Sequence, residues 1–100
     1  MISKAYTPKR TICKVTFTVP GEWADDKVNL VGEFNDWDES SDSMKKNRNG
    51  NWELTLRLKP ESTYKFRYLL DGDTWANDDD ADHYIPNDFG TEDSVVITGK

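Results

Sequence analysis

The stretch TYKFRYLLDG, residues 63–72, decides the fold class of this chain. Four of its apolar residues, Tyr64, Phe66, Tyr68 and Leu70, occupy every second position, and Leu69 is the exception. Successive side chains of a β-strand point to opposite faces, so this period of two predicts a strand with one face in a core. Asp71-Gly72 then supplies the two residues with positive φ that a tight hairpin turn favours.

The same period recurs along the rest of the chain. Alternating runs lie at 14–19, 28–34 and 52–59, and a shorter apolar run, SVVIT, lies at 94–98. Turn dipeptides such as Asn49-Gly50 separate the runs, and apolar residues do not recur at helical spacing over three turns. Six or seven short strands joined by turns predict an all-β fold, an antiparallel immunoglobulin-like sandwich.

Length and composition narrow the class of protein. One hundred residues suit a single domain with one core, and no apolar stretch approaches the roughly 20 residues that span a bilayer. The N-terminus lacks the apolar segment of a signal peptide, and the lone Cys13, expected to be buried, cannot form an internal disulfide. We therefore expect one cytoplasmic domain over 1–100, with 1–11 as a loosely ordered arm.

The net charge of −6 is unevenly distributed. Residues 1–20 hold four Lys and Arg residues and no acid, whereas 71–93 hold nine acids and no Lys or Arg. An acidic surface repels phosphate backbones, so we expect no nucleic-acid partner, and the acidic run is expected to form a solvated face.

Alternation also sorts the tryptophans. Trp52 is in phase with its strand and is predicted to be core, and Trp23 is predicted to cover one open end of the sandwich. Trp37 and Trp75 each follow a turn among polar residues, so spacing alone leaves open whether they are plugs or exposed platforms. The remaining predicted core is Val15, Phe17, Leu30, Leu54, Leu56, Tyr64, Phe66, Tyr68 and Val96.

An exposed pair of indoles suits a sugar, because axial C–H groups make one face of a pyranose apolar. If each ring shields about 100 Å² at ~25 cal/mol/Å², each contributes about 2.5 kcal/mol. Association losses reduce this gross sum, so we expect a Kd between roughly 10 μM and 1 mM. Lys65, opposite Tyr64 and Phe66 on its strand, is either a hydrogen-bond donor to such a sugar or an ordinary solvated lysine.

Three strings carry a family resemblance: VNLVGEFNDW (28–37), YKFRYLLDGDTW (64–75) and NDFGTEDSVVI (87–97). In this order they resemble carbohydrate-binding module family 48, the glycogen-binding type of the AMP-activated protein kinase beta subunit and of isoamylase and branching-enzyme N-termini. The resemblance extends from about residue 12 to 98. It implies an early-set immunoglobulin-like fold and non-catalytic binding of α-1,4-glucan such as glycogen, starch or maltooligosaccharides.

The resemblance also implies roles for single residues. In glucan-binding members, tryptophans at the positions of Trp37 and Trp75 are stacking platforms, and the lysine at the position of Lys65 donates hydrogen bonds to sugar hydroxyls. The first and second motifs therefore imply two stacking platforms, Trp37 and Trp75, with the basic residue Lys65 between them in the sequence.

The third motif implies an apolar contact and two polar ones. Phe89 occupies the place of a side chain that inserts into the curve of the glucan, and Thr91 matches a threonine with a polar contact. Asp93 stands where those members have an asparagine, and a carboxylate accepts hydrogen bonds but cannot donate as an amide does. The segment 74–88 is longer than in the kinase subunit, which predicts a reshaped rim.

Other functions remain open at this point. Glycoside hydrolysis needs two carboxylates across a cleft, and the only histidine, His83, has no Cys or activated Ser beside it in sequence. Four aspartates at 78–82 suggest calcium, although EF-hand spacing is not met. An exposed tryptophan patch also suits an early-set protein-interaction or accessory domain of glycoside hydrolases without sugar affinity. We expect no enzymatic activity, cofactor, metal or membrane; the expected partners are an α-glucan and a glycan-metabolising enzyme.

Overall fold

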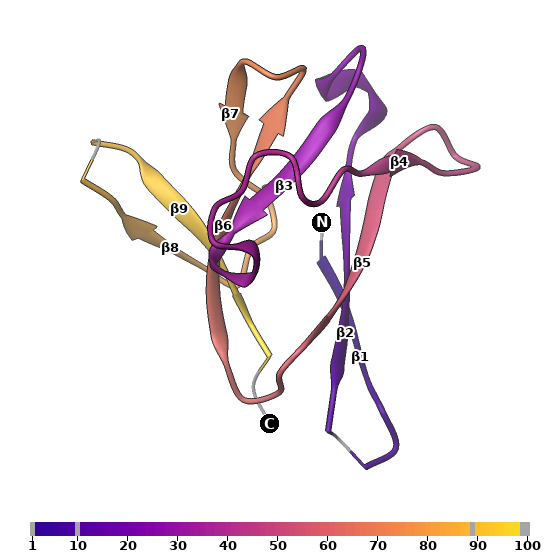
Figure 1. Cartoon of the computed structure of the whole chain (residues 1–100), viewed down its shortest axis with the longest axis vertical. Helices are drawn as coiled ribbons and strands as arrows, with labels where there is room; N and C mark the ends of the chain where they lie inside the picture. Colours follow the sequence, from indigo (N-terminus) through magenta and orange to yellow (C-terminus); the bar gives the residue numbers. More distant parts are fainter. Residues whose placement is uncertain (1, 10, 89, 99–100) are drawn as a thin grey trace.

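Two antiparallel sheets pack face to face in the computed structural model, which describes residues 2–9, 11–88 and 90–98 (Figure 1). The predicted all-β sandwich is therefore confirmed. In the described part of the chain the helical elements are two 3-10 turns, η1 (Gly21–Trp23) and η2 (Glu33–Asn35). None of the helices found there has the length and apolarity to cross a membrane.

The first sheet, called sheet A here, has the strand order β1-β2-β5-β4. Its strands are β1 (Ile2–Tyr6), β2 (Cys13–Val19), β4 (Lys45–Lys46) and β5 (Trp52–Leu58). The second, sheet B, has the order β3-β6-β9-β8, and β7 also pairs with β6. Its strands are β3 (Val28–Gly32), β6 (Thr63–Leu70), β7 (Thr74–Ala76), β8 (His83–Pro86) and β9 (Glu92–Ile97).

The N-terminal segment differs from its predicted form. The sequence predicts a loosely ordered arm over 1–11, whereas Ile2–Tyr6 forms β1, paired with β2 along its whole length. Ile2 and Tyr6 are half-buried and pack against the core, and this apolar contact holds the strand in place.

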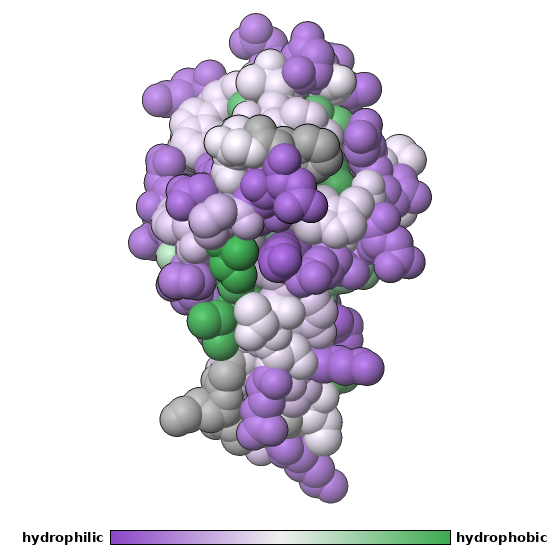
Figure 2. Space-filling model, turned by 90° about the vertical axis from the view of Figure 1, so that its left-hand side faces the viewer, coloured by the Kyte–Doolittle hydropathy of each residue, from purple (hydrophilic) through white to green (hydrophobic). Residues whose placement is uncertain are grey.

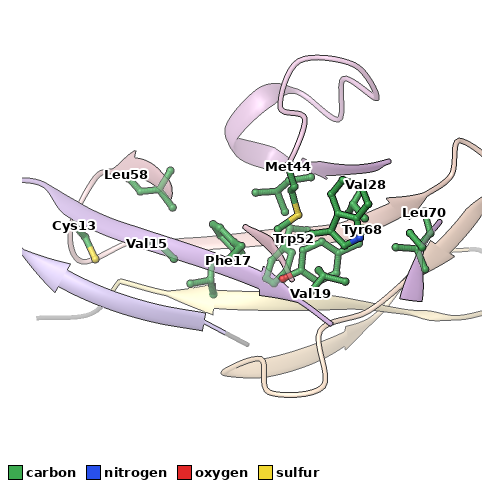
Figure 3. Close-up of a cluster of buried hydrophobic side chains, with 14 residues drawn as sticks. Cys13, Val15, Phe17, Val19, Val28, Met44, Trp52, Leu58, Tyr68 and Leu70 are labelled. Atoms are coloured by element: carbon green, nitrogen blue, oxygen red, sulfur yellow. The ribbon is translucent and has the colours of Figure 1, made fainter. Parts of the chain in front are cut away.

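The core lies between the sheets and follows the alternation of the strands (Figure 3). Cys13 and Trp52 are buried as predicted, and Trp23 packs partly buried against the core. Leu54, Leu56 and Tyr64 were predicted to be core residues and are half-buried at its margin. The fully enclosed aromatic centre is formed by Phe17, Phe66 and Tyr68, whose rings meet edge to face.

The two predicted hairpin turns differ in backbone conformation. Asp71 and Gly72 both have positive φ, 52° and 78°, as predicted. At the other turn only Gly50 does, at 82°, and its N–H donates to the carbonyl of Asn47 at 3.0 Å. The prediction of two positive-φ residues at Asn49-Gly50 was wrong, because this loop is longer than a two-residue turn and needs one left-handed residue at its end.

The Asp71 carboxylate joins this turn to the segment before β3. Its oxygens accept the backbone N–H groups of Asp25, Asp26 and Lys27 at 2.7–3.0 Å. These hydrogen bonds lower the pKa of Asp71, because they favour the charged form.

Asp71→Asn is expected to flatten the acid side of the stability profile. A depressed folded-state pKa stabilises the fold above the unfolded pKa of about 3.9, and that stabilisation is lost as pH falls through the folded pKa. Wild type should therefore melt higher than the variant at neutral pH; the difference should shrink below about pH 4 and vanish once the pH is below the lowered folded-state pKa. Melting temperatures of both proteins across pH 2–7 measure this pH dependence. A difference in melting temperature that stays constant over this range would contradict the lowered pKa of Asp71.

The acidic segment 77–82 forms a turn and is not wholly solvated. Asp78 is 1% exposed, and the Tyr68 hydroxyl donates to its Oδ2 at 2.6 Å. The Asp78 N–H donates to Ser94 Oγ at 2.9 Å. Burial, and then the nearby Asp78 charge, raise the pKa of Tyr68 well above its usual value. Asp78 was predicted to be solvated with the rest of the acidic run; it is instead buried, and its hydrogen bonds join this turn to sheet B.

Tyr68→Phe is expected to lower the free energy of unfolding by roughly 1–3 kcal/mol, because the buried Asp78 carboxylate loses a donor. Tyr64→Phe is the matched control, since the half-buried Tyr64 hydroxyl only accepts the Lys59 N–H at 3.3 Å. Urea unfolding of both variants makes the comparison. Equal losses in the free energy of unfolding would show that the Tyr68–Asp78 hydrogen bond contributes no more to stability than the Tyr64–Lys59 hydrogen bond.

Candidate functional site

The outer face of sheet B carries the candidate site. Phe66 and Tyr68 point into the core, so Arg67 between them points outward from β6. Trp75 in β7 is directly opposite Leu69 and shares that face. In β9, Ser94 and Val96 are paired with the core side of β6, which leaves Asp93 facing outward.

An open groove of about 670 Å³ lies on this face. Its described lining residues are Trp37, Arg67, Trp75, Asn87, Thr91 and Asp93. Both indoles are exposed, each at 39% of its surface, so neither ring is a plug. Both line this groove, so they are not on opposite sides of the domain. Of the six residues singled out from the sequence, Trp37, Trp75, Thr91 and Asp93 come together here. Phe89 lies outside the described residues.

Lys65 is the predicted residue that does not line the groove. It is half-buried on the same outward side of β6, two residues from Arg67, and its backbone N–H donates to Glu33 Oε1 at 2.7 Å. Its role as a sugar hydrogen-bond donor therefore stays a prediction, and Arg67 is the basic side chain at the groove.

The loop after β3 directs two aromatic side chains in opposite directions: Phe34 packs against the core, and Trp37 faces solvent. The Phe34 ring packs 5.9 Å from Phe17 and 6.4 Å from Phe66, measured between centroids. A Cβ at Gly32 would lie 2.9 Å from the Phe34 ring and 2.6 Å from a backbone oxygen, so only glycine permits this approach. With Phe34 anchored inward, Trp37 is left facing solvent.

The backbone at Trp37 is strained. Asp36 and Trp37 have φ of 56° and 59°, in the left-handed region that bulky side chains rarely adopt. The Trp37 N–H donates back to the Gly32 carbonyl at 2.8 Å, the closing bond of a Schellman-type turn. Each such residue costs of order 1–3 kcal/mol and persists only where the surroundings impose it. The loop therefore holds an indole outward at the expense of stability.

Asn35 is the residue that imposes this loop. Its Oδ1 accepts the Gly32 N–H at 3.1 Å, and its Nδ2 donates to the Leu30 carbonyl at 2.9 Å. Nδ2 also donates to Asp42 Oδ2 at 2.7 Å. The amide thus ties the end of β3 to both sides of the loop that carries Trp37.

Asn87 organises the part of the groove that the β8–β9 turn contributes. Its Oδ1 accepts the Thr91 N–H at 3.2 Å and the Thr91 hydroxyl at 3.1 Å, and its Nδ2 donates to Asp93 Oδ1 at 3.0 Å. Asp93 is only 9% exposed, so its carboxylate supports the β8–β9 turn more than it faces solvent. Asn87 supplies an amide near the position where Asp93 replaces the asparagine of the resembling proteins.

Arg67 was missed from the sequence. Its guanidinium lies over the Trp75 indole, 5.7 Å from the ring centroid, a favourable cation–π arrangement. Its Nε is buried with no hydrogen-bond partner among the residues described. Arg67 and Lys65 have the same phase on the strand, and only the position of the groove along β6 distinguishes them.

The structure supplies little for metal or acid–base chemistry. In the described ranges no three His, Cys, Asp or Glu residues are grouped so as to hold a metal ion. Asp93 is the one carboxylate among the described lining residues, and His83 is exposed in β8, paired with Val95. The surface on the β8–β9 side of the molecule is mostly hydrophilic, with a small hydrophobic patch (Figure 2).

The fold and the groove define an immunoglobulin-like β-sandwich that displays aromatic side chains on an outer sheet face. The chain belongs to the carbohydrate-binding module 48 family (isoamylase N-terminal domain), which it matches over residues 7–85. This confirms the resemblance. A stretch of 40 residues is 50% identical to a 1,4-alpha-glucan-branching enzyme of Rhizophagus irregularis, covering 38% of this chain and 6% of that protein. The chain thus spans a small part of this relative's length.

Proposed function

We propose that this chain binds α-1,4-glucan and does not itself cleave or transfer it. The observation that carries the proposal is that two exposed indoles, Trp37 and Trp75, line one groove on the outer face of sheet B. Membership of a carbohydrate-binding module family associated with glucan-active enzymes supports it.

The binding step follows from the chemistry of the groove. Each indole covers the apolar face of a glucose unit, and two rings shielding about 100 Å² each contribute a gross ~5 kcal/mol. Trp75 is held from behind by the Arg67 guanidinium, which limits the side-chain entropy lost on binding. After the losses of association, the Kd should lie between roughly 10 μM and 1 mM.

Polar contacts orient the sugar. Arg67 is the basic side chain among the described lining residues, and the terminal N–H groups of its guanidinium can donate to sugar hydroxyls. Thr91 and Asn87 also line the groove; the Thr91 hydroxyl donates to Asn87, and its oxygen can accept a hydrogen bond from a sugar hydroxyl. We propose Arg67 as the main basic contact at the groove, with Lys65 reaching only a glucan long enough to extend beyond it.

Absence of catalysis is part of the proposal. Hydrolysis of a glycosidic bond uses two carboxyl groups on either side of the bond. The described lining of the groove offers the single carboxylate of Asp93, already hydrogen-bonded to Asn87. Purified protein incubated with glycogen should release no reducing ends; steady release by homogeneous protein would contradict this.

A titration with maltoheptaose, followed by tryptophan fluorescence and by indole and amide NMR shifts, tests binding directly. Shifts should concentrate at Trp37, Trp75, Arg67 and Thr91, with a Kd in the range above. Cellohexaose, whose β-linked chain is straighter, is the matched control and should bind more weakly. Unchanged indole signals of Trp37 and Trp75 at tens of millimolar maltoheptaose would contradict the proposed glucan binding.

A further inference from the structure

Basic and acidic residues are segregated between the two layers of the sandwich. Segments 2–19 and 44–61, which contain all of sheet A, hold nine of the 13 Lys and Arg residues of the chain. They hold only two of its 19 acidic residues, Glu53 and Glu61. The other 17 acids belong to sheet B and to the loops around it. A chain of net charge −6 therefore has one layer of opposite sign.

A pair of like charges lies at the centre of this basic layer. Lys14 of β2 and Arg57 of β5 are directly opposite in the antiparallel register, and both are exposed on the outer face. Among the described residues neither forms an ion pair. Like charges directly opposite on neighbouring strands destabilise a sheet. Lys59 follows Arg57, and Lys9 lies in the turn between β1 and β2; the acid on the outer face of β5, Glu53, lies four residues from Arg57.

The surroundings of the pair are flat and unobstructed. Small side chains occupy the neighbouring outer positions: Ser3 and Ala5 on β1, Thr16 on β2 and Thr55 on β5. The hydroxyls of Thr16 and Thr55 lie 2.8 Å apart, bonded to each other across the strands. Strand β1, which extends this face, lies outside the matched family region 7–85.

We propose that the outer face of sheet A is a docking surface for an acidic patch on a partner protein. Carboxylates facing Lys14 and Arg57 would replace their mutual repulsion with attraction, and charge complementarity would fix the orientation of the complex. Nucleic acid or an anionic membrane fits less well, because its charge extends past this face toward the acids of the loops, where it is repelled. A protein patch presents its charges locally.

The location of this surface has a functional consequence. The glucan groove lies on the outer face of sheet B, and the two outer faces are on opposite sides of the sandwich (Figure 1). A partner on sheet A leaves the groove open, so the domain joins a glucan to a second protein. Occupation of one face should therefore leave affinity at the other unchanged.

A fluorescein-labelled decaglutamate peptide serves as the probe of the acidic partner. At about 20 mM salt it should bind with NMR shifts confined to β1, β2 and β5, about tenfold more weakly at about 200 mM salt, and equally well with saturating maltoheptaose. Lys14→Glu should weaken peptide binding about tenfold and raise the melting temperature, because Glu then faces Arg57. Lys27→Glu, with the same change of net charge beside sheet B, should bind the peptide like wild type.

The combination of higher stability and weaker binding separates a docking role from a structural one. Equal weakening by Lys27→Glu, or shifts on sheet B, would overturn the assignment of the face. Tighter salt-dependent binding of a ten-base-pair DNA duplex to the same strands would overturn the class of partner. Sedimentation showing that the chain dimerises through β1, β2 and β5 would replace the partner protein with a second copy. None of these results depends on glucan affinity.

Discussion

Trp37→Gly is expected to weaken maltoheptaose binding about 60-fold while leaving the domain at least as stable as wild type. Loss of one stacking platform removes about 2.5 kcal/mol, and each 1.4 kcal/mol corresponds to a factor of ten in Kd. The indole contributes little to the core, since it is exposed, and its backbone φ of 59° suits glycine.

Comparison with Trp37→Ala isolates the cost of the left-handed backbone at position 37. Alanine removes the same indole but keeps a Cβ in the left-handed region, so Trp37→Gly should be more stable than Trp37→Ala by about 1 kcal/mol. Calorimetric titration and urea unfolding of both variants measure the two effects separately. A large fall in stability in the glycine variant would mean that Trp37 is structural, and unchanged affinity would remove it from the site.

Asn35→Asp is expected to produce the second large effect, on the loop that positions Trp37. The new carboxylate would face Asp42 Oδ2 across the present 2.7 Å contact and would leave the Leu30 carbonyl without its donor. We expect a loss of roughly 1–3 kcal/mol in the free energy of unfolding. Glucan affinity should also fall, because Trp37 is no longer held in one orientation.

The double variant Asn35→Asp, Asp42→Asn is the test of this mechanism. It restores a donor facing an acceptor with the direction reversed, so it should recover part of both stability and affinity. A double-mutant cycle gives the coupling energy, which should be at least about 0.5 kcal/mol for residues in contact. Strict additivity of the two single variants would rule out the Asn35–Asp42 hydrogen bond as the device that orients the loop.

The sandwich could be predicted because its strands alternate, and alternation reflects burial directly. Tyr64 to Leu70 has one apolar side, and that side faces the core. Strand β8 was not predicted, since HYIP is short, ends in proline and lies at a sheet edge, where few contacts constrain its sequence. The left-handed Gly50 turn also escaped prediction in detail, because Asn-Gly suits more than one hairpin loop.

The groove could be predicted only in part. Trp37 and Trp75 were identifiable because neither fits an alternating strand. Arg67 was not, because Lys65 has the same phase and nothing local says where along β6 the groove lies. Asn87 was missed because its role depends on Thr91 and Asp93, which the β8–β9 turn brings to it. Such contacts depend on the register between strands, and periodicity within one strand does not contain that information.

The guanidinium that lies over Trp75 has a consequence for how a polymer meets this domain. With one side of that ring occupied by Arg67, a ligand can approach it only from the other side. Because the groove is open along an outer sheet face, a glucan bound as proposed would lie across the domain on the ring face that Arg67 leaves free. Attachment of this kind needs no free terminus, so many copies could coat a large branched particle along its outer chains while leaving the tips accessible to enzymes.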